Sequence, residues 1–263
     1  MMKYMKYASL AMLLFLLTVP GFSQEPTGHD IMHEMLNQST WDDMQATVTL
    51  TLKTSRGEIR VRTIDFYSKS TKDDESSMLM RFVKPADVEG TGFLMIEHDD
   101  GEDERYLYLP ALRRVKRIAA SGSGGNFMSS DFTYYDIGEP ELEDWTYSRL
   151  ADTTIGEKPA FVIECHPKTD QIREDTGYGK IIRYILQDKL NNVKTVYFDE
   201  SMQKKKVLDV KEYIVVNGAD FESNMVMHDV QIDHTSIMEF DDIQTNTGIP
   251  EDFFSQRYLQ RMR

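Results

Sequence analysis

The apolar residues of this chain recur at every second position from Met44 onward, and this period constrains the fold more than any other feature. Val48, Leu50 and Leu52 alternate with threonines, which is typical of a β-strand with one buried face. Later segments repeat the pattern, and the pair at residues 217–218, Asn-Gly, is a strong hairpin signal. The sequence predicts a mainly β protein with about 10–11 strands in an antiparallel sheet or barrel, and short helices only near residues 24–40 and 249–263.

The first 23 residues have the layout of a secretory signal peptide. Lys3 and Lys6 precede an apolar run at residues 8–19, and small residues follow it up to Ser23. The run is too short to cross a bilayer, and no cysteine follows it that could carry a lipid. We predict cleavage near Ser23, export, and a single domain over residues 24–263, because no shift in composition marks a further boundary.

Charge and cysteine content exclude several classes of function. The formal net charge is −14 at pH 7, so we expect no binding to nucleic acid or to a bare anionic membrane surface. Cys165 is the only cysteine, so no disulfide can form within the chain. Stability must therefore come from the packed core alone.

The sequence offers no arrangement typical of a catalytic or metal site. No serine lies in a G-x-S-x-G elbow, and Cys165 and His166 point to opposite faces of one predicted strand. His29 and His33 have the spacing of a helical metal-binding pair, but no third ligand accompanies them. We predict a protein that is not an enzyme and needs neither a cofactor nor a metal.

Several predicted strands carry large apolar residues on both faces, as at residues 78–79 and 181–182. Such a sheet must be covered on each side, and predicted helix is too scarce to cover both. Methionine suits irregular apolar surfaces, and it recurs on these strands. Two interpretations stay open: ordinary core packing, and a curved sheet around a cavity for an apolar ligand. Under the second, the candidate lining residues are Met78, Met80, Phe82, Leu94, Ile96, Leu107, Phe132, Met225 and Met227.

A basic cluster at residues 113–117 leads into a glycine-rich loop at residues 121–125. We interpret the loop as a hinge for a lid segment, residues 127–137. The cluster could dock on an acidic partner, or it could pair with acids of this chain at Asp131, Asp136 and residues 139–144. The candidate gating or docking residues are Lys84, Pro85, Arg113, Arg114, Lys116, Arg117 and Asp131.

Four stretches are similar to a known family: residues 81–92 (RFVKPADVEGTG), 106–117 (YLYLPALRRVKR), 130–134 (SDFTY) and 253–261 (FFSQRYLQR). They resemble the outer membrane lipoprotein-sorting proteins, a LolA-like branch of the periplasmic LolA/LolB-type carriers. The resemblance implies an incomplete antiparallel β-barrel, with a few helices covering its open side over a hydrophobic cavity. The candidate lining residues would then contact lipid.

The resemblance also implies a function. It points to a periplasmic carrier, or chaperone, that moves lipoprotein acyl chains or other lipid toward the outer membrane. An inner-membrane exporter and an outer-membrane acceptor are candidate partners, with only transient membrane association. In the better-known carriers an Arg-Pro pair helps control the lid; the matching pair here is Lys84-Pro85, and lysine lacks the planar fork of arginine. The alternative is an accessory, partner-binding subunit of an envelope transporter of the resistance-nodulation-division type, because members of the branch are often encoded beside such exporters.

Overall fold

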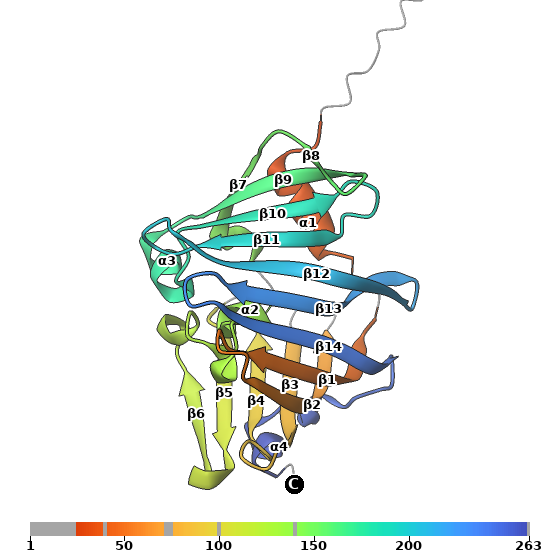
Figure 1. The fold of residues 1–263 in the computed structure, drawn as a ribbon. Coiled ribbons are helices and arrows are strands. Elements are labelled where there is room, and N and C mark those ends of the chain that lie inside the picture. The colour runs from red at the N-terminus through yellow and green to blue at the C-terminus, as the bar shows by residue number, and fades with distance from the viewer. Residues whose placement is uncertain (1–24, 39–40, 71–75, 99–100, 139–140, 262–263) are drawn as a thin grey trace, which may run out of the picture.

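The computed structural model describes residues 25–38, 41–70, 76–98, 101–138 and 141–261. The predicted signal peptide lies outside these ranges. One antiparallel sheet of 14 strands occupies most of them (Figure 1). The strands are β1 (Asp43–Lys53), β2 (Ile59–Ser70), β3 (Ser76–Lys84), β4 (Gly92–Glu97), β5 (Glu104–Leu109), β6 (Arg114–Ile118), β7 (Trp145–Arg149), β8 (Thr153–Ile155), β9 (Lys158–Pro167), β10 (Lys180–Leu186), β11 (Asn192–Phe198), β12 (Lys204–Val216), β13 (Ala219–Asp229) and β14 (His234–Thr245).

The described residues form four short α-helices: α1 (Gly28–Leu36), α2 (Tyr134–Ile137), α3 (Asp170–Thr176) and α4 (Gln256–Arg261). The spacing of Thr27 and Asp30 in the sequence predicts a capping box at the start of α1. The structure confirms it, since Asp30 N donates to Thr27 Oγ1 (3.2 Å) and Thr27 N donates to Asp30 Oδ2 (2.9 Å). No helix in the described ranges has the length and apolarity to cross a membrane.

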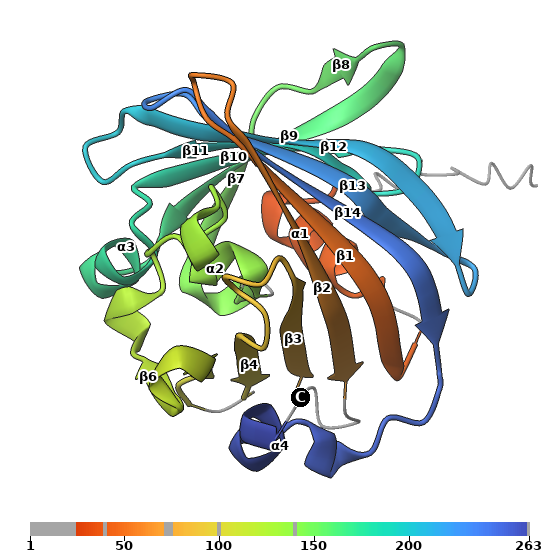
Figure 2. The same cartoon turned by 60° about the horizontal axis from the view of Figure 1, so that its bottom comes forward.

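The sheet curves strongly but does not close into a barrel. Its strand order is β6-β5-β4-β3-β2-β1-β14-β13-β12-β11-β10-β9-β7, and β8 pairs with β9 outside this path. Strands β6 and β7 are therefore the two edges, and the sheet curls around α1 and α2 (Figure 2). The predicted fold class, an incomplete antiparallel barrel with a few helices, is confirmed.

The predicted number of strands was too low, because the sequence pattern missed β6, β8 and β14. The pattern of residues 224–234 by itself predicts one strand after the Asn-Gly turn, whereas β13 ends at Asp229 and a hairpin leads into β14. The turn contains Asp233 at φ 54°, a left-handed conformation that aspartate tolerates. In contrast, the expected hairpin at Asn217 and Gly218 is confirmed between β12 and β13, with φ values of 49° and 88°.

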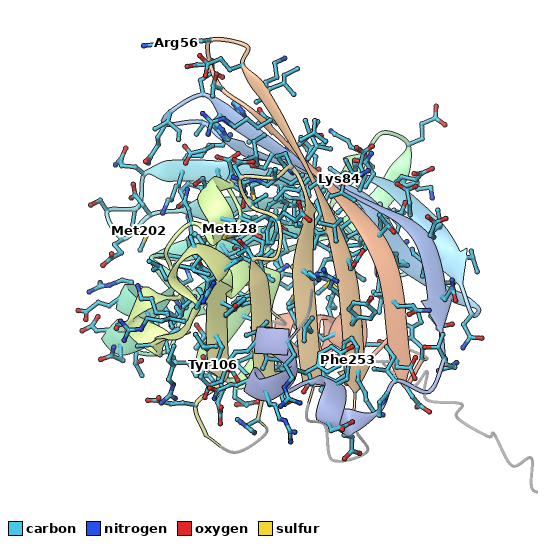
Figure 3. The ribbon with its side chains drawn as sticks, turned by 90° about the horizontal axis from the view of Figure 1, so that it is seen from below. Arg56, Lys84, Tyr106, Met128, Met202 and Phe253 are labelled. Carbon is cyan, nitrogen blue, oxygen red and sulfur yellow. The ribbon has the colours of Figure 1, made fainter. Side chains whose placement is uncertain are left out.

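Both faces of β3 and β4 are covered, which explains their apolar residues on each side. On the concave face, Met80 and Phe93 belong to the main core. On the convex face, Leu79 and Leu94 pack against Leu259 of α4, in a smaller cluster that Ile249 and Phe254 complete. Figure 3 shows the C-terminal segment on this side, with its labelled residue Phe253; the labelled Tyr106 of β5 packs in the same cluster.

The segment between β6 and β7 covers part of the concave side. Its Phe127 ring packs against the rings of Phe82 and Phe93, with centroids 6.0 and 5.3 Å away. In the glycine-rich loop, Gly124 N donates to Asp175 O (2.8 Å) of α3. A Cβ on Gly124 would lie 2.9 Å from the carbonyl oxygen of Thr176, so only glycine permits this close approach.

Candidate functional site

The curved sheet encloses a cavity of about 420 Å³, a size within the usual range of small-molecule pockets of about 300–1,000 Å³. Its walls come from α1, from strands β2, β3 and β10–β14, and from the lid segment. Most lining side chains are apolar. The period of two in the strands brings these side chains to one face, and the curvature of the sheet turns that face into a concave surface.

The structure brings five of the nine predicted lining residues to this cavity: Met78, Met80, Phe132, Met225 and Met227. Phe82 and Leu107 are buried in the same core but do not line the cavity. Leu94 and Ile96 lie on the convex face, where they pack with the C-terminal segment. Their assignment to the cavity is therefore corrected, because the sequence alone does not tell which of two apolar faces points inward.

Four aromatic rings that the sequence analysis did not select form one wall of the cavity. Trp41 contacts Phe221, and Phe221 contacts Phe240, with ring centroids 6.0 and 5.1 Å apart. Phe240 in turn contacts Phe66 at 5.4 Å. All three pairs have edge-to-face geometry, which aromatic rings prefer. Phe240 was overlooked because β14, the strand that carries it, was not predicted.

Arg183 also lines the cavity, and the sequence analysis missed it. It lies on β10 between Ile181 and Ile185 on the inward face, and only 8 % of its surface is exposed. Its neighbours include the Tyr135 hydroxyl and the Cys165 thiol. Burial raises the pKa of Cys165 to about 11, so this thiol is protonated at neutral pH.

Glu222 is the second ionisable group on this stretch of wall. The Tyr213 hydroxyl donates a hydrogen bond to Glu222 Oε1 at 2.8 Å and contacts the Asn192 carbonyl oxygen at 2.8 Å. Burial raises the pKa of Glu222, while the Tyr213 hydrogen bond and the charge of Arg183 oppose the rise. The cavity thus combines an apolar wall with a few polar groups.

A buried ion pair and buried hydrogen bonds hold the lid segment against β12 and β14. Lys206 Nζ donates to Asp136 Oδ2 (2.5 Å) and to the carbonyl oxygen of Asp131 (2.8 Å). The Asp131 carboxylate contacts His234 Nδ1 at 2.7 Å and accepts a hydrogen bond from Ser236 Oγ at 2.7 Å. The candidate gating residue Asp131 is therefore fully buried and bound to β14.

The basic cluster does not pair with these acids. The chain does not continue as a strand past Pro110: a 3-10 turn (Pro110–Leu112) precedes Arg113, which has φ 47°. Arg114, Lys116 and Arg117 lie exposed on the edge strand β6, and Arg117 approaches Glu102 at 3.8 Å. The alternative in which the cluster pairs with Asp131 or Asp136 is not found, since His234 contacts Asp131 and Lys206 pairs with Asp136. Of the other acids in that alternative, residues 139–140 lie outside the described ranges.

Lys84 and Pro85 are exposed at the end of β3, and neither lines the cavity. Lys84 is labelled in Figure 3. A different cation contacts the lid segment. The guanidinium of Arg62, a buried residue of β2, donates to the carbonyl oxygen of Met128. Three strands, β2, β12 and β14, therefore bind the lid segment through polar side chains.

Cys165 and His166 do not meet in the structure, as expected from their adjacent positions on a strand. His166 contacts Glu164 at 2.9 Å and lies on the face opposite Cys165, and no group of three metal-ligating side chains is found within the described ranges. The geometry of the site is that of a binding cavity.

A family model described as "Uncharacterized protein" matches residues 74–261, well over half of the chain. The chain belongs to this family. No match was found among the curated proteins. Among solved structures, a domain from Vibrio parahaemolyticus assigned to outer membrane lipoprotein sorting superposes with a TM-score of 0.84 at 29% identity, over 89% of this chain and 98% of the other.

Two further structures show the fold. A DUF1329 family protein from Desulfovibrio piger has a TM-score of 0.83 at 22% identity, covering 88% of this chain and 97% of the other. A LolA superfamily protein from Nitrosomonas europaea has a TM-score of 0.70 at 16% identity, covering 89% and 99%. The predicted resemblance to LolA-like lipoprotein-sorting proteins is confirmed, and the fold is LolA-like.

Proposed function

We propose that this chain is a periplasmic carrier that binds lipoprotein acyl chains or other lipid and moves them toward the outer membrane without covalent chemistry. The cavity of about 420 Å³, walled by methionine and aromatic side chains, carries the proposal. The similarity to the Vibrio parahaemolyticus domain supports the same class of function. Cleavage of residues 1–23 and a single domain over residues 24–263 belong to the proposal.

Burial of methylene groups would supply the binding free energy. Each buried methylene contributes about 0.8 kcal/mol, so about ten of them contribute roughly 8 kcal/mol before the cost of immobilising the chain. A binding free energy of roughly 8 kcal/mol corresponds to a dissociation constant of about 1 μM, and the cost of immobilisation weakens the affinity from this value. Cargo held in this way stays bound in water and leaves when the cavity opens at an acceptor.

The test is the lipid content of protein purified without detergent and exposed to membranes. We expect mass spectrometry of the extract to find bound lipid with the wild type. Met225→Trp fills the cavity and should remove most of it. Val226→Trp is the matched control, because Val226 follows on β13 and points to the opposite face. A wild type without lipid, or equal loss in both variants, would contradict the proposal.

The exposed basic cluster on edge strand β6 favours a second candidate function, docking on an acidic partner such as an envelope exporter. Charge reversal of Arg113, Arg114, Lys116 and Arg117 should then abolish co-purification of the partner and leave lipid content unchanged. Unchanged partner binding would exclude the docking role.

A further inference from the structure

Arg183 forms no ion pair among the described residues. Among the described residues, no carboxylate lies within 4.0 Å of its guanidinium. Its surroundings are Tyr135, Tyr147, Tyr197 and Cys165, which are neutral at pH 7 because burial raises the pKa of each hydroxyl and of the thiol. A buried arginine without an ion pair is unusual and costly, so a role for this charge is expected.

The nearby polar groups already have other contacts. The Tyr147 hydroxyl donates to the Leu142 carbonyl oxygen (3.0 Å), and the Tyr135 hydroxyl accepts from Trp145 Nε1 (2.8 Å). Glu222 interacts electrostatically with Arg183 but lies more than 4.0 Å from it, and it accepts a hydrogen bond from Tyr213.

Arg183 lies where the cavity meets a small recess of about 10 Å³ between α1 and β7. Met32 of α1 and Trp145 of β7 form the walls of this recess. The guanidinium is therefore at the end of the cavity nearest to α1 and β7, while Met78, Met225 and Phe240 supply apolar walls to the rest.

Three carboxylates also line the cavity, but Asp136 pairs with Lys206, Asp220 pairs with Lys189, and Glu222 accepts a hydrogen bond from Tyr213. Among the described lining residues, Arg183 is the one cation.

We propose that Arg183 binds the anionic head group, a carboxylate or a phosphate, of an acyl lipid whose chain lies in the apolar part of the cavity. This inference rests on the proposed function and names its ligand class, an ionised single-headed amphiphile rather than a neutral ester or amide. The planar guanidinium matches two oxygens of such a head group, and the low polarity of the cavity strengthens the contact. The aromatic wall formed by the rings of Trp41, Phe221, Phe240 and Phe66 would contact the acyl chain of this lipid.

The experiment compares three ligands with the same sixteen-carbon chain, namely palmitate, hexadecyl phosphate and methyl palmitate, by calorimetric titration of the delipidated protein. We expect palmitate or hexadecyl phosphate to bind at least about tenfold more tightly than the ester, the contribution of a charge-assisted hydrogen bond. Each acid gives a ratio, its affinity divided by that of the ester. The acid with the larger ratio identifies carboxylate or phosphate as the preferred head group. In Arg183→Gln the ratio should fall to about one while the affinity for the ester stays the same.

Two further variants keep the test independent of misfolding. Arg183→Lys retains the charge without the fork and should give an intermediate ratio. Lys180→Gln removes a cation from the opposite face of β10 and should leave the ratio unchanged. Equal affinity of the wild type for acid and ester, or an equal loss for both ligands in Arg183→Gln, overturns the inference while the carrier function stands. Failure of all three ligands to bind the wild type overturns the carrier function itself.

Discussion

Lys206→Met tests the ion pair that fastens the lid segment. The side chains of Lys206 and Asp136 are 1% and 3% exposed, and their Nζ–Oδ2 distance is 2.5 Å. Methionine keeps the length of the side chain and removes the charge, so Asp136 remains buried without a cation. It keeps two donors, the Thr133 amide (2.7 Å) and the Tyr178 hydroxyl (2.9 Å).

The expected loss follows from these contacts. Removal of one partner from a buried ion pair costs about 3–5 kcal/mol. Because Asp136 retains two hydrogen bonds, we expect the lower end, about 3 kcal/mol, which for a chain of this size lowers the melting temperature by roughly 6–12 °C. Urea unfolding followed by tryptophan fluorescence measures the loss, and hydrogen exchange should show faster exchange in residues 127–137 before the rest of the sheet.

The double variant Lys206→Met with Asp136→Asn separates charge from packing. Asparagine preserves the acceptor for Thr133 and removes the unpaired carboxylate, so most of the lost stability should return. If the double variant is as unstable as Lys206→Met, or if Lys206→Met melts at the wild-type temperature, the ion pair does not hold the segment and the reasoning is refuted.

Three further predictions concern other parts of the chain. Burial alone would raise the pKa of Asp43, but hydrogen bonds from the backbone of residues 247–249 hold this pKa below its usual value. The contribution of Asp43 to stability is therefore complete above about pH 5 and is lost as the pH falls through the lowered pKa. Proteolysis of residues 246–261 should rise in that acidic range, and it should rise at neutral pH in Asp43→Asn. Cys165, with its pKa raised to about 11, should react with iodoacetamide at pH 8 only after unfolding, and rapid alkylation of the native protein would refute its burial. Gly124→Ala should destabilise the protein by about 1–3 kcal/mol because its Cβ meets the Thr176 backbone, whereas Gly57→Ala, with open space around it, reports only the strain of a positive φ.

Features that depend on neighbouring residues in the sequence could be predicted. The strand period, the Thr27–Asp30 capping box and the hairpin at residues 217–218 are all local, and each is confirmed. The edge strand β6 was missed because four basic residues within it and before it hide its alternation. Strand β14 was missed because the preceding turn contains Ile232, an apolar residue that lengthened the apparent strand.

The charged residues of the site could not be predicted, because their burial depends on partners far away in the chain. Lys206 is the last of three consecutive lysines, a pattern that indicates solvent exposure, and its carboxylate partner is 70 residues away. Arg183 stands between isoleucines on a strand whose two faces are both apolar in sequence. Only the tertiary structure shows that one of these faces encloses a cavity.

The contacts of the lid segment differ on its two sides, and this difference gives its opening a direction under the proposed carrier function. Toward β3 and β4 the segment makes apolar contacts through Phe127. Toward β12 it makes a buried ion pair through Asp136, and toward β14 a buried hydrogen bond through Asp131. An incoming acyl chain can replace apolar contacts at little cost, because the surface it covers stays out of water. It cannot replace an ion pair, since separated charges would stay buried without partners. We therefore expect the contacts of Phe127 to open before the Lys206–Asp136 ion pair when the cavity is filled, with β12 as the fixed side.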